Sequence, residues 1–287
     1  MRAILMAAVA ALALTASPAL AGCAFPPAGL DLMRTVAQSD VVVEGSIALT
    51  PEQLTALRGK TEWVDVPFAV TRTLKGPAAD TVNIRFYPAT DYAPALSDLE
   101  LAAGHRVVVY LHRLAEAGPP GLYFAAGEGS MRSASEGLMA NAEIGRQDAI
   151  LKAWAPDTSL PHFAEVKVLL AQLTAVSRDD KAAADKQQAV FAQLEALGED
   201  AVPAIVAQMD DRRPLAQPAM SLKNQSPQAF EATRHYSPKT VVDAIDAELN
   251  QITGEFGTVY NGGSDTERDS AVKAWRVYAH DRMCGAG

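Results

Sequence analysis

The spacing of the apolar residues changes part-way along this chain. Between residue 40 and about residue 125 they alternate with polar residues, as in 63–74 and 81–87. From about residue 160 onward they recur every three or four positions, as in 162–176 and 186–197. Alternation turns one face of a β-strand toward a core, and the longer spacing does the same for an α-helix. The sequence therefore predicts an α+β fold of two domains, a small β structure followed by an all-α domain.

Several short β-strands are expected in the first part. Gly45 lies inside the first of them, which predicts a bulge or a sharp bend, and Lys75-Gly76-Pro77 predicts a turn after the second. Short strands separated by turns are typical of a small antiparallel barrel or sandwich. Apolar residues at helical spacing predict a short helix over 30–37, before the first strand. The strands are expected at 41–47, 63–74, 81–87, 107–111 and 122–126.

Amphipathic helices are expected in the second part. Gly198 follows the second helix at a position where a left-handed residue is common, and Pro203 falls within the first turn of the third. Between the two parts, residues 131–159 are rich in Gly, Ser and Ala and are expected to be a linker. The helices are expected at 162–176, 186–197, 201–209, 241–252 and 271–279.

The first 22 residues have the features of an export signal. Arg2 supplies a positive charge, residues 4–14 form an apolar segment too short to span a bilayer, and the residues before Cys23 are small. No later stretch approaches the roughly 20 apolar residues of a membrane span. We therefore expect residues 1–22 to be a signal peptide and the protein to be periplasmic or secreted.

The chain has two cysteines, Cys23 and Cys284, and two interpretations of them remain open. Ala19-Leu20-Ala21 predicts cleavage before Gly22, after which Cys23 and Cys284 would form a disulfide that stabilises by roughly 3 to 5 kcal/mol. Alternatively, Leu20-Ala21-Gly22-Cys23 resembles the bacterial lipobox, in which a lipid on the cysteine anchors the protein to a bacterial membrane. A lipidated Cys23 could not pair with Cys284, so only the disulfide accounts for both cysteines.

After an early cysteine and a short helix, the β half contains four segments of mainly β-branched and apolar residues. They are 39–45 (SDVVVEG), 70–76 (VTRTLKG), 82–84 (VNI) and 104–111 (GHRVVVYL). In this arrangement residues 23–130 resemble the netrin-like, tissue-inhibitor-of-metalloproteinase-like modules of exported bacterial proteins. The resemblance implies that this domain is an OB-type β-barrel.

The helical half carries a different resemblance. Residues 194–211 resemble a HEAT-type helical hairpin, with a Leu-Gly turn between two helices and an acidic end. The segments 252–257 and 268–278 also resemble the tail of some exported HEAT-containing proteins. The resemblance implies that residues 160–287 form a HEAT-like domain, in which neighbouring hairpins bury their apolar faces and present a ridge to a protein partner.

Charge and motifs favour binding over catalysis. The net charge is −9, and one unit more negative without Arg2, which argues against nucleic acid and anionic lipid as partners. The histidines show no H-x-x-x-H spacing, and His105 and His112 lie at opposite ends of one expected strand, so neither a metal nor another cofactor is expected. No catalytic residue is assigned, because the sequence holds no G-x-S-x-G, P-loop or G-x-G-x-x-G motif.

Other distinctive residues receive structural interpretations. Residues 210–213 (Asp-Asp-Arg-Arg) are expected to form a solvated turn at a helix end, and 261–265 a loop that caps the last helix. Trp63, Trp154 and Trp275 are expected to pack in a core or between the two parts.

Two functions remain open at this point. The favoured one is a cell-envelope protein that binds another protein without catalysis. The alternative is an envelope hydrolase with its site in the cleft between the two parts, so the sequence does not decide whether the protein is an enzyme. We expect an envelope protein as partner, no nucleic acid, and membrane contact only through a lipid on Cys23.

Overall fold

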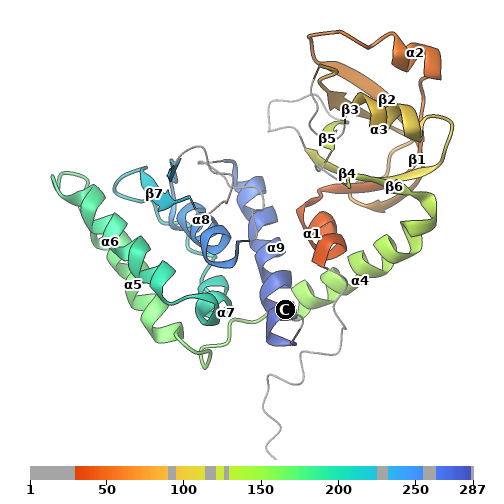
Figure 1. Cartoon of the computed structure of the whole chain (residues 1–287). Coiled ribbons are helices and arrows are strands. Elements are labelled where there is room, and N and C mark those ends of the chain that lie inside the picture. The colour runs from red at the N-terminus through yellow and green to blue at the C-terminus, as the bar shows by residue number, and fades with distance from the viewer. Residues whose placement is uncertain are drawn as a thin grey trace, which may run out of the picture.

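Five strands close into a β-barrel in the first half of the chain (Figure 1). The computed structural model describes residues 30–89, 95–113, 121–125, 129–224, 232–254 and 263–285. The strand order is β1-β2-β3-β5-β4, and a further pairing of β1 with β4 closes the barrel. The strands are β1 (Val41–Ile47), β2 (Val64–Lys75), β3 (Thr81–Phe86), β4 (Val107–Arg113) and β5 (Leu122–Ala125), with β6 (Met131–Ser133) also paired to β4.

The predicted α+β fold with a small β-barrel is confirmed. The barrel was expected to be antiparallel, and β1 does pair antiparallel with β2 and with β4, but β3 and β5 run parallel. This order and direction are compatible with the OB-type barrel that the resemblance implies. The barrel interior is apolar, because alternate residues such as Phe68 on β2 and Ile84 on β3 point inward and are fully buried.

Gly45 bends β1, as its position in the sequence predicts. The register between β1 and β2 shifts between Glu44 and Gly45. A Cβ atom at Gly45 would lie 2.0 Å from the backbone oxygen of Ala69 on β2, so the two strands can approach this closely only at a glycine.

Among the described residues, the α-helices on the barrel side of the chain are α1 (Leu30–Gln38), α2 (Pro51–Thr55), α3 (Leu96–Ala102) and α4 (Gly137–Ala153). Leu99 of α3 packs into the barrel core. α1 and α4 pack against the outside of β1 and β4, where Val36 and Ile144 contact Val42 and Tyr110. We call residues 30–153 the barrel part and residues 154–285 the helical part.

The stretch 131–159, which the sequence analysis interprets as a linker, is largely helical. It contains β6 and the 17-residue helix α4. Alanine and leucine are strong helix formers, and their contribution outweighs that of the two glycines in α4. Gly137 also has a packing role, because a Cβ atom there would lie 3.2 Å from the guanidinium of Arg72. The connection between α4 and α5 that is neither helix nor strand is therefore limited to residues 154–162.

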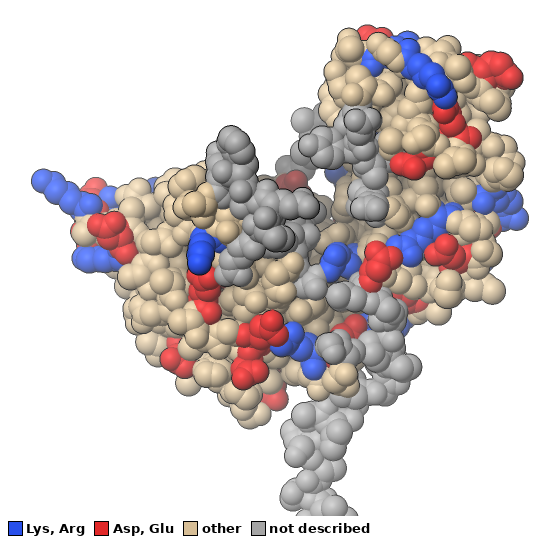
Figure 2. Space-filling model, viewed as in Figure 1, with Lys and Arg blue, Asp and Glu red and all other residues tan. Residues whose placement is uncertain are grey.

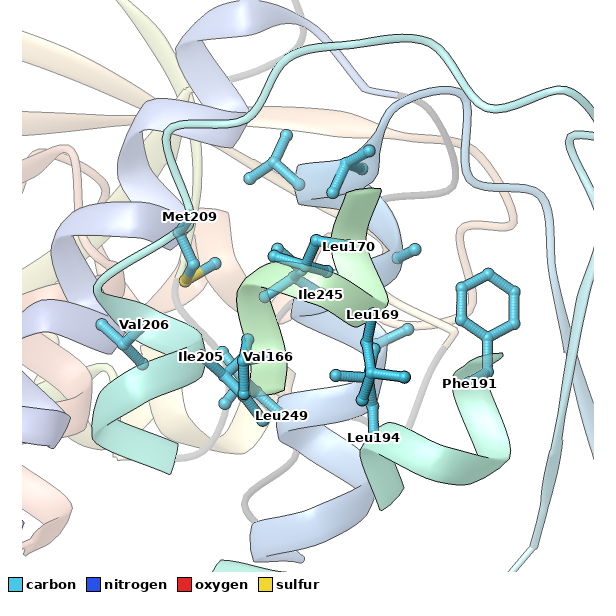
Figure 3. Close-up of a cluster of buried hydrophobic side chains, with 14 of the residues drawn as sticks. Val166, Leu169, Leu170, Phe191, Leu194, Ile205, Val206, Met209, Ile245 and Leu249 are labelled. Carbon is cyan, nitrogen blue, oxygen red and sulfur yellow. The ribbon is translucent and has the colours of Figure 1, made fainter. Parts of the chain in front are cut away.

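The helical part has α5 (Phe163–Ala175), α6 (Ala183–Ala196), α7 (Val202–Val206), α8 (Val241–Thr253) and α9 (Asp265–Met283), which fits the predicted helices. It also contains a two-stranded antiparallel sheet of β7 (Met220–Lys223) and β8 (Thr233–Tyr236). The sequence analysis missed this sheet, so the domain is helical but not all-α. In its core, Val166 and Leu170 of α5 and Ile205 of α7 pack around Ile245 and Leu249 of α8 (Figure 3).

Three helices join the two parts. Met33 and Ala37 of α1, Ile150 of α4 and Val277 of α9 form a small buried apolar cluster where the helices meet (Figure 1). Beside it, Arg146 of α4 forms hydrogen bonds with Asp281 of α9 at 2.6 and 2.9 Å. The barrel is thus attached to the helical part through α1 and α4.

Two sequence predictions fall on residues that the structure does not describe. The signal peptide, 1–22, and Cys23 lie outside the described residues, so the signal, the lipid and the Cys23–Cys284 disulfide stay predictions. Across the described ranges, none of the helices combines the length and the apolar character that a membrane crossing requires.

Candidate functional site

A pocket of about 480 Å³ lies where the two parts meet. Its walls come from α1, the start of β1, the ends of β2 and β4, α4 and the first turns of α9. Volumes of a few hundred Å³ are typical of small-molecule sites. Six charged residues from both parts line this pocket, which we call the charged pocket: Asp40, Lys75, Arg113, Asp148, Asp269 and Lys273.

Lys75 contributes a partly buried ammonium group to the charged pocket. It is the last residue of β2, and its Nζ donates a hydrogen bond to the backbone oxygen of Val36, 2.8 Å away in the last turn of α1. Burial lowers the pKa of Lys75 to about 8, although the nearby carboxylates of Asp40 and Asp148 act in the opposite direction. The partial negative charge at the C-terminus of α1 favours an ammonium group at this point.

Two carboxylates of the charged pocket already have partners. Asp40 accepts hydrogen bonds from the backbone N–H of Arg113 at 2.9 Å and from the hydroxyl of Ser270 at 3.2 Å. Asp269 is paired with Arg212 at 2.6 Å. These bonds link the barrel to α9 and α9 to the end of α7, so the two carboxylates contribute to the structure of the junction.

The serines of the charged pocket do not form a nucleophile–base pair. Ser39 donates to the backbone oxygen of Thr35 at 2.6 Å, and Ser270 donates to Asp40. A serine nucleophile needs a base such as histidine or lysine within hydrogen-bond reach. Within the described ranges neither hydroxyl has such a base as its hydrogen-bond partner.

A serine–histidine contact does occur elsewhere, on the β7–β8 sheet. Ser221 and His235 are opposite each other in the register, and Oγ lies 3.0 Å from Nδ1. No carboxylate among the described residues hydrogen-bonds to this histidine, so a third group that would orient it is missing. We interpret the contact as a cross-strand pair that stabilises a short sheet.

The histidines that the sequence analysis weighed as ligands are not brought together. His105 lies in the turn before β4 and His112 near the end of that strand. Burial lowers the pKa of His112, which favours its neutral form. Within the described ranges no group of three or more His, Cys, Asp or Glu side chains could hold a metal ion.

The remaining predicted residues lie at helix ends. Ser264 caps α9 and accepts a hydrogen bond from the backbone N–H of Glu267, which agrees with the predicted cap, although 261 and 262 lie outside the described residues. Cys284 is the C-terminal cap of α9, and its Sγ lies 3.9 Å from Nε2 of His280.

The expected solvated turn at 210–213 is held by ion pairs. Asp210 binds Arg276 at 2.6 Å, and Arg212 binds Asp269, so both attach the end of α7 to α9. Asp211 pairs with Arg213. The charged side chains of 210–213 therefore form ion pairs within the chain.

An aromatic patch lies on the outside of the barrel, and the sequence analysis missed it. Trp63 lies just before β2, with ring centroids 5.4 Å from Tyr87 and 5.6 Å from Phe124. It is 58% exposed, so its expected role in core packing is wrong, whereas Trp275 is buried as expected. The alternation of side chains along β2 could have predicted this exposure. Val64 and Val66 face inward, so the side chain of Trp63, one position before Val64, faces outward.

A charged pair borders the aromatic patch. Arg85 on β3 is opposite Asp65 on β2 and next to Phe124 on β5 in the strand register. Its guanidinium donates two hydrogen bonds to the Asp65 carboxylate, at 2.8 and 2.9 Å. Two parallel bonds fix the plane of the guanidinium beside the rings.

Comparison with known proteins adds no family to this description. No protein-family model matches the chain, and neither a curated protein nor a solved structure matches it significantly. The candidate sites therefore rest on geometry and chemistry alone.

Proposed function

We propose that this protein is an exported, non-catalytic cell-envelope protein that binds another protein through the aromatic patch of its barrel. The observation that carries the proposal is the cluster of Trp63, Tyr87 and Phe124 on the outer face, with Trp63 more than half exposed. Tryptophan, tyrosine and arginine are the residues most enriched at the energetic centres of protein interfaces. An exposed tryptophan in contact with two other rings offers a large apolar surface whose side chains are already ordered.

The charges of the molecule support a protein partner over nucleic acid. The net charge is −9, and both signs are interspersed over the face of the molecule in Figure 2. Nucleic-acid binding draws most of its affinity from clustered Lys and Arg on phosphates. The proposal therefore places the partner among envelope proteins.

The finer family assignments belong to the same proposal. A netrin-like identity for residues 23–130 is supported by the closed barrel, with α3 between β3 and β4. A HEAT-like identity for residues 160–287 is supported by the packing of α5 against α6 and by the turn at Gly198 between α6 and α7.

Export rests on the sequence of residues 1–22 and on the two cysteines. Intact mass of the protein purified from the envelope tests it, measured with and without reductant. We expect a chain that begins at Gly22 and gains two hydrogens on reduction, as a Cys23–Cys284 disulfide requires. A lipid-sized mass increase on Cys23 would support the alternative anchor, and a full-length chain in the cytoplasm would overturn export.

The alternative of an envelope hydrolase has one supporting feature. The charged pocket lies between the two parts, where that hypothesis places its site. Its serines, however, are bonded to a backbone oxygen and a carboxylate instead of a base that could activate them. The geometry therefore favours the binding function.

Capture of partners from envelope extract tests the binding function. We expect the mature protein to retain an envelope protein and Trp63→Ala to lose it. Leu101→Ala is the matched control, because Leu101 is an exposed apolar residue on α3. Equal capture by wild type and Trp63→Ala, or retention of glycan or DNA in place of protein at physiological salt, would contradict the proposal.

A further inference from the structure

Three cations of the charged pocket have no carboxylate partner. In the described part of the chain, no carboxylate oxygen lies within 4.0 Å of the charged nitrogens of Lys75, Arg113 or Lys273. Other described lysines, among them Lys152 and Lys167, also lack one, and these three cations differ from them in lining a single pocket. The three cations come from β2, β4 and α9, and so from both parts.

The carboxylates of the pocket do not balance these cations. Asp269 is paired with Arg212, and the hydrogen bonds of Asp40 come from neutral donors that leave its charge in place, so Asp40 and Asp148 face the three cations. Lys75 and Lys273 are close enough to repel each other, and this repulsion disfavours the charged form of Lys75. A pocket with surplus positive charge and restricted solvent binds an anion more strongly than an open surface does.

We propose that the charged pocket binds a small organic anion that carries a carboxylate or phosphate group. Lys75, held in place by its bond to the Val36 carbonyl, would contact the anion inside the pocket, with Lys273 and Arg113 at the exposed rim. The hydroxyl group of Thr266 also lines the pocket and can donate a hydrogen bond, whereas that of Ser270 already donates to Asp40.

Asp148 limits how such a ligand can lie. Its carboxylate repels an anion near α4 and that of Asp40 repels one near the start of β1, so the acidic group of the ligand would lie closest to the three cations. Because the ligand would contact residues of the barrel and of α9 together, binding would stabilise the junction between the two parts. The proposed function does not depend on this site, and the two can fail separately.

Calorimetric binding and thermal unfolding of the mature protein test the site, with inorganic phosphate and succinate as probes at constant ionic strength. We expect saturable binding and a Tm that rises with probe concentration. Binding of phosphate alone would assign the site to phosphoryl groups, and binding of succinate alone to carboxylates. Lys273→Met and Arg113→Met, which change exposed side chains, are each expected to weaken binding by about tenfold.

Two further variants complete the test. Asp148→Asn is expected to tighten binding, because it removes the repelling carboxylate. Lys60→Met is the matched control, since Lys60 is an exposed lysine outside the pocket, and it should bind as wild type does. The proposal is overturned if neither probe binds, or if Lys273→Met and Arg113→Met bind both probes as tightly as Lys60→Met does.

Discussion

The barrel part and the helical part place their charged residues differently. The barrel keeps an apolar interior, and its acids lie outside that interior, where the buried Glu44 binds Arg72 and Arg106 and the partly exposed Asp65 binds Arg85. The helical part is built around α8, in which every residue from 241 to 251 is buried. A strand in a barrel has one face for solvent, whereas a central helix has none, so the acids of α8 must be paired or neutral.

Each buried acid of α8 meets this requirement in its own way. Burial alone would raise the pKa of Asp243, but hydrogen bonds from Arg268 and from the backbone N–H groups of Lys239 and Thr240 lower it below the usual range. Asp246 accepts a hydrogen bond from Trp275 at 2.7 Å. Burial and the nearby Glu195 raise the pKa of Glu248 well above its usual value, which favours its neutral form.

The largest effect is expected from a charge placed inside either core. Val109→Asp in the barrel or Leu194→Asp in the helical part would bury an unpaired carboxylate at a cost of about 4 kcal/mol or more, since both residues are buried. Each variant should unfold its own part. Tryptophan fluorescence reports on Trp63 and Trp275, and circular dichroism on the helices. Unchanged melting temperatures for both variants would show that the core assignments are wrong.

The next effect compares two arginine–aspartate pairs directly. Arg268→Met should destabilise the protein by about 3 to 5 kcal/mol, because it leaves Asp243 charged and fully buried. Arg85→Met should leave the Tm almost unchanged, because both side chains of the Arg85–Asp65 pair on the barrel are partly exposed to solvent. Denaturant unfolding of the two variants measures the contrast, and equal losses would remove the distinction between the parts.

Glu248→Gln tests whether the buried acid of α8 makes the stability of the protein depend on pH. The pKa of Glu248 is raised in the folded chain. The wild-type protein therefore has its full stability below the pH range in which free carboxyl groups titrate, and it loses stability as the pH rises through that range. At neutral pH the variant should be more stable than wild type by at least about 1 kcal/mol, and the difference should vanish near pH 4. Glu62→Gln, at an exposed carboxylate, is the control. A difference that does not change with pH would mean that Glu248 is ionised in the fold.

A smaller effect concerns the boundary between the parts. Residues 155–159 are exposed and belong to no helix or strand, so a protease of broad specificity should cut there more readily than in α4. Fragment masses locate the cleavage. Preferred cleavage within 137–153 would mean that α4 is not a stable helix, and cleavage within 186–209 would misplace the boundary.

The elements with a regular period could be predicted from the sequence. The strand at 41–47 and the helices of the second half follow the alternation and the three-to-four spacing of their apolar residues. α4 was missed because the Gly, Ser and Ala content of the stretch 131–159 is also typical of loops, and β7 and β8 were missed because four residues are too few to show a period. α8 was predicted to be amphipathic, but it is buried on all sides because other helices cover its polar face.

The candidate sites were harder to predict. The alternation of side chains along β2 predicts that Trp63 faces outward. Its contact with Phe124, however, depends on the strand order of the barrel, which pairs β5 with β3. The charged pocket combines Lys75, Asp148 and Lys273, which are far apart in the sequence and meet only because α1, α4 and α9 pack together. Composition and local spacing contain no information on such a junction.

Site-specific photo-crosslinking tests the central claim, that the barrel carries the partner-binding surface and the helical part supports it. A photoreactive phenylalanine analogue is placed at Tyr87 in the aromatic patch or at Val168, an exposed residue of α5. We predict that irradiation of envelope preparations yields a discrete crosslinked partner from position 87 and none from position 168. Crosslinks from position 168 alone, or from neither position, would contradict the account.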